Sequence, residues 1–552
     1  MGRKNSKKPA RQKGGKKIKQ RSFTAKTLKG VLDITRSGMG FVIVPGTETD
    51  ILIRPGDFNT ALHGDTVRVR IKSEGGRRMQ GVVDEVLQRK RTEFIGHLQM
   101  NKGFAFFVPD MDKPMPDIFI PLPNIHNGKD NDRVVVRLLE WEKDGKRPVG
   151  EVITVLDATN SNDAAMKEIL LEAGFPLQFS EEALEAAARI PDVISATEIK
   201  KRNDIRSILT FTIDPVDAKD FDDAISFRKL KNGNYEIGIH IADVSHYVEP
   251  DNELDKEAYQ RATSVYLPDR VNPMLPEHIS NSLCSLRPHE DKLTFSAIFQ
   301  ITPKAEIKQY WLGKTIIHSD HRFTYEEVQA IIEEKAGIHG EEILLLNDLA
   351  QRMRKKRFQN GAISFSSQEV KFKLDEKGDP IGIMIKESKE AHQLIEEFML
   401  LANRTVAENL SKIKFNNKLV PFPYRVHDDP DEKKLLPFAV FAKKFGHKFD
   451  TSSPDTIAAS FNQLLADVQG KPEQHVLEQL GIRTMAKAKY TIENVGHYGL
   501  GFEHYCHFTS PIRRYPDVQV HRILEQVLTN KIIPDKKLEE KCKHTSERER
   551  AA

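Results

Sequence analysis

The pattern of apolar and polar positions changes twice along the chain. Up to about residue 158, apolar residues alternate with polar ones in short runs that end at Gly, Pro, Asn or Asp. Such runs are typical of short antiparallel strands, and about five of them in about 65 residues fit a small closed barrel. Residues 159–202 instead carry apolar side chains at helical spacing, and residues 203–552 mix both patterns. We therefore predict a multidomain chain with small all-β barrels, a helical connector and a large α+β domain.

The two β regions repeat one another. The recurring blocks are Gly40-Phe41-Val42 and Gly103-Phe104-Ala105, Asp50–Ile53 and Asp117–Ile120, and Asp65–Arg70 and Asp132–Arg137. The second copy carries four extra residues in one loop, around residues 109–116. Because a repeat of this kind indicates one small fold used twice, we expect one β domain over residues 23–90 and another over residues 91–158.

Aromatic residues in these repeats are candidates for nucleic-acid contact. Phe41 in the first copy, and Phe104 with Phe106 in the second, follow glycines on strands whose other face fills the barrel. On the outer face of an OB-like barrel, an aromatic ring can stack on an unpaired base of any sequence. The alternative is that these rings belong to the core. The Gly-Phe-Val and Asp-Ile-Phe-Ile blocks resemble the RNA-binding motifs of cold-shock domains, and this resemblance favours stacking.

The connector predicts two short helices. Apolar side chains recur at i, i+3, i+4 and i+7 from Met166, while Gly174 and Pro176 are placed to end the first helix. Ser180 is a good N-cap for a second helix. We assign no chemistry to this segment.

Composition narrows the class of protein. The chain has 552 residues, of which 39% are hydrophobic and 30% charged, as in globular proteins of several domains. It has no run of about 18 apolar residues, so no membrane span is expected. Cys284, Cys506 and Cys542 lie far apart, which excludes a disulfide framework and the usual four-ligand zinc site. A reducing compartment, the cytoplasm, fits this usage best.

The first residues are strongly basic. Residues 1–21 contain ten Lys and Arg and no acidic residue, whereas acidic residues outnumber basic ones in the rest of the chain. Such a segment has too little apolar surface to fold alone, so we expect a disordered basic arm over residues 1–22. It is either an arm that binds the phosphates of RNA or DNA or a solubilising tail.

A cluster of aspartates is the strongest chemical signal. Within ten residues the chain carries Asp214, Asp217, Asp220, Asp222 and Asp223. Carboxylates this close repel one another, so an ordered cluster needs a cation, and oxygen ligands suit Mg²⁺ or Mn²⁺. Apolar residues between them argue against a plain acidic surface, and the glycine and glutamate of a calcium EF-hand loop are missing. Metal ions held in this way typically serve phosphoryl transfer, which makes nucleic acid the natural substrate.

Two further segments leave alternatives open. Arg513 and Arg514 follow a Ser-Pro turn and could clamp a phosphate, or they could form salt bridges with Glu503 and Asp517. A metal site at His240, Asp243 and His246 can be imagined. The alternating apolar residues around them favour a buried strand and turn instead, and the role of both histidines stays open.

Five short blocks of the large domain form a recognisable set of sequence motifs. They are residues 213–225, Gly238–Val248, Ser264–Arg270, Met274–Pro276 and Ser510–Tyr515. In this order they resemble the catalytic domain of the ribonuclease II and ribonuclease R family, the RNB exoribonucleases. The basic arm and paired barrels are most similar to the bacterial ribonuclease R members. The resemblance implies OB-fold (cold-shock) barrels before an RNB domain, and processive, Mg²⁺-dependent hydrolysis of RNA from a single-stranded 3′ end to nucleoside 5′-monophosphates.

The resemblance also implies roles for individual residues. The acidic metal ligands fall on Asp214, Asp220, Asp222 and Asp223, with Asp222, Asp223 and Arg513 as catalytic residues and Arg514 beside them. The tyrosine that stacks on the terminal base falls on Tyr266, and a second stacking aromatic is nearest to Phe372. Two metal ions would hold the scissile phosphate. We expect a monomer that acts in RNA turnover and quality control without membrane partners.

The chain departs from the family in one respect. The family continues into an S1 RNA-binding domain, whereas this sequence stops at Ala552 in what reads as a late helix of the catalytic domain, so we expect a truncated sequence. The rival function is an RNA-binding or chaperone protein with an inactive catalytic domain. A metal-dependent DNA nuclease is a third hypothesis, which a 2′-deoxy substrate would test.

Overall fold

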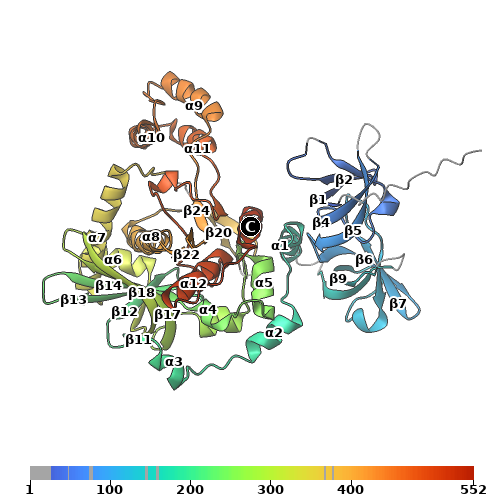
Figure 1. Ribbon diagram of the computed structural model, residues 1–552, viewed down its shortest axis with the longest axis horizontal. Helices are drawn as coiled ribbons and strands as arrows, with labels where there is room; N and C mark the ends of the chain where they lie inside the picture. Colours follow the sequence, from blue (N-terminus) through green and yellow to red (C-terminus); the bar gives the residue numbers. More distant parts are fainter. Residues whose placement is uncertain are drawn as a thin grey trace, which may run out of the picture. The chain divides into compact units, whose positions relative to one another are not determined.

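The computed structural model describes residues 27–47, 49–73, 79–142, 147–156, 161–365, 369–375 and 378–552. The predicted basic arm, residues 1–22, lies outside the described residues. The chain divides into two compact units, Met1–Pro176 and Leu177–Ala552, which Figure 1 colours from blue to red along the sequence.

The first unit contains two closed five-stranded barrels, as the repeat predicts. The first barrel has the strand order β1-β2-β3-β5-β4 and the second the order β10-β8-β7-β6-β9. The strands are β1 Thr27–Ile34, β2 Gly40–Ile43, β3 Ile51–Ile53, β4 Thr66–Ser73, β5 Gln80–Gln88, β6 Glu93–Asn101, β7 Phe104–Pro109, β8 Ile118–Pro121, β9 Arg133–Glu140 and β10 Val149–Val155. Alternate residues point inward because side chains on a strand alternate between its faces, so Leu32 and Val42 are fully buried in one barrel and Ala105 and Phe107 in the other.

The four-residue insertion in the second barrel ties the two barrels together. Lys113 Nζ lies 3.0 Å from Asp33 Oδ1 of the first barrel, and Arg36 Nη2 lies 2.7 Å from Asp112 Oδ2. The insertion that breaks the repeat thus forms ion pairs with the first barrel.

The predicted connector is divided between the two units. Helix α1 (Ser161–Glu172) belongs to the first unit, where Arg91 Nη2 donates to the carbonyl oxygen of Glu172 and Arg133 pairs with Glu168. Helices α2 (Glu181–Ala188) and α3 (Ala196–Lys200) belong to the second unit, and Ser180 caps α2 by accepting from the Ala183 N–H. Both predicted helices are confirmed, but they do not form one connecting body.

The second unit is built on a seven-stranded mixed sheet in the order β11-β18-β17-β14-β13-β12-β19. Its strands are β11 Asn203–Asp204, β12 Thr210–Asp214, β13 Asp223–Lys229, β14 Tyr235–Ala242, β17 Asp291–Ile301, β18 Ile307–His318 and β19 His321–Thr324. Strand β12 pairs antiparallel with β13 and parallel with β19. This α+β arrangement agrees with the predicted fold class.

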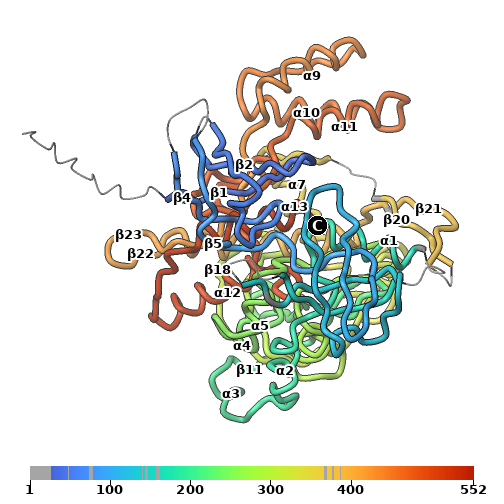
Figure 2. The backbone as a smooth tube through the Cα atoms, turned by 90° about the vertical axis from the view of Figure 1, so that its right-hand side faces the viewer, coloured from blue at the N-terminus to red at the C-terminus, as the bar shows by residue number. Residues whose placement is uncertain are grey.

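Helices and small two-stranded sheets surround the central sheet (Figure 1). They are α4 Val244–Tyr247, α5 Glu253–Arg261, β15 Val265–Tyr266, β16 Val271–Asn272, the π-helical turn η3 His278–Leu283, α6 Tyr325–Glu334, α7 Gly340–Gln359, β20 Glu369–Leu374, β21 Pro380–Lys386, α8 Glu390–Leu410, β22 Lys414–Phe415, β23 Lys418–Leu419, β24 Tyr424–Val426, α9 Glu432–Lys444, α10 Pro454–Val468, α11 Gln474–Thr484, β25 Lys489–Thr491, α12 Tyr515–Leu528 and α13 Leu538–Ala551. Helices α9, α10 and α11 share an apolar core of their own and project from the sheet as a lobe (Figures 1 and 2). In the described part of the chain, no helix combines the length and apolar character that a membrane crossing requires.

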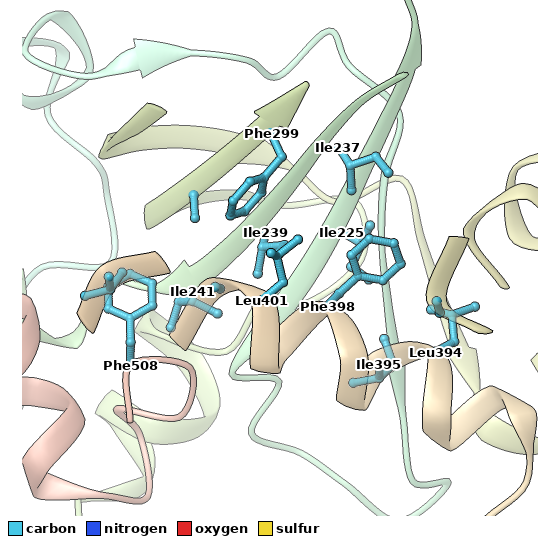
Figure 3. Close-up of a cluster of buried hydrophobic side chains, with 14 of the residues drawn as sticks. Ile225, Ile237, Ile239, Ile241, Phe299, Leu394, Ile395, Phe398, Leu401 and Phe508 are labelled. Atoms are coloured by element: carbon cyan, nitrogen blue, oxygen red, sulfur yellow. The ribbon is translucent and has the colours of Figure 1, made fainter. Parts of the chain in front are cut away.

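Helix α8 packs its apolar face on the sheet (Figure 3). Leu394 and Phe398 of the helix share one buried cluster with Ile237 and Ile239 of β14. Phe508, which precedes the arginine pair, is fully buried in the same cluster. Burying each side chain of this size contributes about 1.5–3 kcal/mol, so the segment that carries the arginines is anchored in the main core of the unit.

Candidate active site

Four aspartates gather where two neighbouring strands meet. Asp214 is the last residue of β12 and Asp223 the first residue of β13, and the loop between these antiparallel strands carries Asp220 and Asp222. Asp214 and Asp222 are buried. The strand pairing therefore places all four carboxyl groups at one edge of the sheet.

Burial shifts the titration of these carboxyl groups. Removal from water raises the pKa of Asp214, Asp220, Asp222 and Asp223 above the usual value for aspartate. The charges of Asp220 and Asp222 raise the pKa of Asp214 further, and the charge of Asp214 does the same to Asp223. Since ionised carboxylates are disfavoured here without a counter-charge, the cluster is arranged to attract cations.

The donor set fits the predicted Mg²⁺ or Mn²⁺. All four donors are carboxylates, which these hard cations prefer, and Asp214 Oδ2 is buried without a hydrogen-bond partner in the described part of the chain. No group of three or more His, Cys, Asp or Glu side chains among the described residues has the spacing of a formed metal site. Asp222 instead accepts from the Ile512 N–H at 2.9 Å and lies 3.4 Å from Arg513 Nε. The four-aspartate metal site therefore stays a prediction.

The loop before α12 is held by buried side-chain oxygens. The backbone N–H of Phe508 donates to Asn403 Oδ1, and that of Ser510 donates to Asp517 Oδ1, both at 2.8 Å. With the bond from Ile512 to Asp222, three backbone donors of this loop are fixed by three separate side chains. Buried polar networks that are satisfied in this way make a loop rigid, so the arginines that follow have a defined position.

The two arginines have different surroundings. Arg514 donates from Nε to Asp517 Oδ2 at 3.0 Å and from Nη2 to Oδ1 at 2.7 Å, which is one of the salt bridges considered from the sequence. Arg513 faces Asp222, donates from Nη2 to Ser510 Oγ and keeps 41% of its side chain exposed. Arg513 is therefore the arginine whose guanidinium a substrate can reach, and Arg514 supports the loop. RNA contact by Arg514 stays a prediction.

Tyr266 is brought to the same place by a second chain segment. Ser264 N–H and Thr263 Oγ1 both donate to the carbonyl oxygen of Arg513, at 3.1 and 3.2 Å. Tyr266, two residues later, is 55% exposed. Burial of part of the ring raises the pKa of its hydroxyl, and the charge of Asp220 raises it further. The sequence-predicted stacking residue thus lies beside the aspartates and Arg513, with ring surface left for a base.

Tyr325 also lies at the aspartates, although it was not among the residues predicted from the sequence. It follows β19, whose Thr324 is paired with Asp214 in the parallel ladder. Burial raises the pKa of Tyr325, and the charges of Asp223 and Asp214 raise it further. Its ring stacks on His392 with a centroid distance of 4.2 Å. Only the sheet order brings this residue to the site, and no local motif marks it.

Phe372 lies on an exposed hairpin that touches the aspartate loop. The hairpin is formed by β20 and β21, and the ring of Phe372 is partly exposed. The neighbouring Lys371 Nζ lies 3.0 Å from Asp217 Oδ2. Asp217, the fifth aspartate of the cluster, is thus drawn toward the hairpin. The stacking role of Phe372 stays a prediction.

The barrel aromatics lie on outer faces, as expected from strand alternation. Phe41 is half-buried on β2, between Asp33 and Leu52 of its neighbours. In the second barrel, Phe104 and Phe106 form a group with Phe119, with ring centroids 5.4 to 6.1 Å apart. Their half-buried outward positions are not those of core residues, and their stacking on bases stays a prediction. Phe119 belongs to the repeated block but was not singled out from the sequence.

His240 is a core residue and not part of a formed metal site. It is fully buried, with Nδ1 2.7 Å from Ser296 Oγ and Nε2 2.8 Å from Ser226 Oγ, and burial lowers its pKa to about 3. Asp243 is buried against Lys314 at 3.1 Å, so its charge is already balanced. The predicted buried strand is confirmed as the end of β14, whereas the segment after it forms the short helix α4 in place of a turn.

Comparison with known proteins agrees with this geometry. The family model of the RNB domain matches residues 202–530, that of the Ribonuclease B OB domain residues 30–86 and that of the Cold shock domain residues 106–180. Ribonuclease R of Aquifex aeolicus is 36% identical over 93% of this chain and 73% of its own length, and that of Thermotoga maritima 37% identical over 95% and 75%. The structure of Mycoplasma genitalium RNase R in complex with ribose methylated single-stranded RNA matches with a TM-score of 0.75 and 27% identity, covering 95% of this chain and 84% of that one.

The matched family therefore agrees with the arrangement of the candidate active site. The RNB match spans the aspartate loop, Tyr266 and the arginine loop, which the structure brings together from distant parts of the sequence. The chain belongs to the RNB family, in its ribonuclease R group, and is an exoribonuclease of the 3′-to-5′ class.

Proposed function

We propose that this chain hydrolyses RNA from a single-stranded 3′ end and releases nucleoside 5′-monophosphates, with Mg²⁺ bound by the four aspartates. One observation carries the proposal: four carboxyl groups of raised pKa, two of them buried, lie beside a half-exposed arginine and a half-exposed tyrosine. Cations, a scissile phosphate and a terminal base are the three groups that such a site accommodates together.

Each residue has a separate role in the proposed reaction. Asp214, Asp220, Asp222 and Asp223 would hold two metal ions, which supply an activated water and neutralise charge on the phosphate oxygens. Arg513 donates to the scissile phosphate and offsets the negative charge that develops during in-line attack.

Tyr266 acts on the base and not on the phosphate. Its exposed ring stacks on the 3′-terminal base and so sets which phosphodiester bond reaches the aspartates. Stacking does not depend on base identity, which suits an enzyme that moves along RNA of any sequence. This suits the degradation of RNA of any sequence, and we propose that the chain acts processively in RNA turnover and quality control.

The barrels supply the upstream RNA contacts in this proposal. Phe41, and the group of Phe104, Phe106 and Phe119, offer rings on outer barrel faces where successive unpaired bases can stack. We propose that the chain acts as a monomer. Three free, buried cysteines support a reducing compartment such as the cytoplasm.

The substitution Asp223→Asn tests the proposal. It removes one carboxylate charge from the cluster, so we expect the rate of RNA hydrolysis to fall by more than about a hundred-fold while RNA affinity changes by less than about two-fold. Gel assays of cleavage and fluorescence anisotropy of a 5′-labelled RNA measure the two effects.

Asp217→Asn is the matched control. Asp217 lies in the same loop, but its side chain is 64% exposed and pairs with Lys371. We expect nearly normal activity from this variant. A normal rate for Asp223→Asn, or an equal loss in both variants, would contradict the assignment. The alternative of an inactive RNA-binding chain gains no support, because the four aspartates, Arg513 and Tyr266 are all present in the sequence.

A further inference from the structure

A single buried serine holds the backbone on both sides of Asp220. The hydroxyl of Ser285 accepts from the Phe221 N–H at 3.0 Å and donates to the carbonyl oxygen of Lys219 at 2.8 Å. Ser285 is fully buried. One hydroxyl thus uses its donor and an acceptor site to fix the two peptide groups that flank a predicted metal ligand.

Neighbouring residues hold the backbone next to Asp222. The Leu286 N–H donates to the carbonyl oxygen of Phe221 at 3.0 Å, and the Ala242 N–H donates to that of Asp222 at 2.9 Å. The backbone from Lys219 to Asp222 is therefore fixed by a short run of hydrogen bonds. By contrast, the preceding part of the loop faces solvent, as the exposed side chains of Val216 and Asp217 show.

Ser285 is itself held rigidly. It follows the π-helical turn η3, a rare conformation that is frequent at functional sites. Lys292 Nζ donates to the carbonyl oxygen of Ser282, and Cys284 and Leu286 are buried in one apolar cluster with Phe221. The serine therefore has a defined place from which to position the loop.

We propose that Ser285 is a positioning residue for Asp220 and Asp222, and that it sets the affinity of the aspartate cluster for divalent cations. This inference rests on the proposed function, in which those carboxylates hold the metal. Groups that orient metal ligands typically account for about 10- to 100-fold in metal affinity. Ser285 is fully buried and its hydroxyl bonds the backbone of the loop, so its proposed effect is on the geometry of the carboxylates.

The substitution Ser285→Ala tests the proposal. We expect Mn²⁺ binding to the RNA-free protein, followed by the electron paramagnetic resonance signal of free Mn²⁺, to weaken by about ten-fold. The Mg²⁺ concentration for half-maximal cleavage rises by a similar factor, and saturating Mg²⁺ restores most of kcat. The KM for RNA and the RNA affinity in EDTA stay within about two-fold of wild type, because base and phosphate contacts are intact.

Ser296→Ala is the matched control. Ser296 is also fully buried in the same unit, but its hydroxyl is 2.7 Å from His240 Nδ1 on the central sheet. We expect this variant to lose stability comparably and to bind Mn²⁺ normally. Ser285→Cys keeps a hydrogen-bonding group of similar size, so it is expected to fold and to show intermediate metal affinity even where the alanine variant does not fold.

Three results would overturn the proposal. They are normal Mn²⁺ affinity in Ser285→Ala, equal weakening in Ser296→Ala, and a Ser285→Cys protein that folds but binds Mn²⁺ as the wild type does. Failure of the proposed function is separate, since it would appear as a wild-type chain that neither binds Mn²⁺ nor cleaves RNA. Metal-dependent wild-type cleavage with an unaffected Ser285→Ala variant contradicts only the role of the serine.

Discussion

The arginine loop offers the sharpest single perturbation, Asp517→Asn. Asp517 is fully buried, and its two oxygens accept from the Ser510 N–H and from Arg514 Nε and Nη2. An asparagine keeps one acceptor oxygen for Ser510, but its amide NH₂ then faces a guanidinium donor. Arg514 is left as a buried charge without its counter-ion.

The magnitudes follow from this geometry. Breaking a buried ion pair by removing one partner costs about 3–5 kcal/mol, which for a unit of this size lowers Tm by about 4–6 °C. Arg513 is adjacent to the displaced Arg514, and a shift of about 1 Å in a catalytic group can cost about a hundred-fold in rate. We therefore expect kcat to fall by about that factor, while RNA affinity changes by less than about three-fold.

Single-turnover cleavage at saturating Mg²⁺ and thermal unfolding at the same pH measure these effects. The control is Glu93→Gln in the second barrel, where a buried carboxylate pairs with Arg137 at 2.8 Å. It loses a similar ion pair, so it lowers stability and leaves kcat unchanged. Asp517→Asn with a lowered Tm and a wild-type kcat would show that Asp517 supports the fold without setting the position of Arg513.

Three other predictions concern binding and pH. Tyr266→Ala removes a half-exposed ring, and because base stacking is worth about 1–3 kcal/mol, we expect the Kd for a short single-stranded RNA to rise by about 5- to 160-fold in anisotropy titrations. An unchanged Kd would contradict stacking. Replacing Phe104 and Phe106 with alanine should weaken the binding of long RNAs and leave the binding of trinucleotides unchanged. Equal weakening for both lengths would contradict a contact between these rings and the upstream part of the RNA. Burial raises the pKa of Asp214 and Asp223, so the folded chain binds more protons than the unfolded one above the usual aspartate pKa. The Tm of metal-free protein should therefore fall from pH 5 to 7, and Mg²⁺ should reverse the loss. A Tm that rises over this range in EDTA would contradict the raised pKa values of Asp214 and Asp223.

Much of the fold was predictable because it depends on local patterns. Alternating apolar residues and a repeat with one insertion are sufficient for two closed barrels. The aspartate cluster could be predicted for the same reason, since its members lie at most nine positions apart in the sequence and one pair of neighbouring strands brings them together. Arg513, nearly three hundred residues later, was found through the family resemblance and not through spacing.

The missing parts of the site depend on long-range packing. Tyr325 reaches Asp214 only because β19 pairs with β12, and Ser285 reaches the aspartate loop only through the fold of the segment after η3. The sequence alone also does not distinguish the roles of the adjacent residues Arg513 and Arg514. Which of them pairs with Asp517 is decided by the direction in which each side chain leaves the loop.

A time course with 5′-labelled single-stranded RNA tests the central claim most directly. Purified chain is incubated with Mg²⁺ or with EDTA, and the products are resolved on a denaturing gel. Processive 3′-to-5′ hydrolysis predicts that, with Mg²⁺ only, full-length RNA is converted to a short 5′-labelled end product without populated long intermediates. Tight RNA binding with no cleavage in Mg²⁺, or release of the label as a mononucleotide at early times, would contradict it.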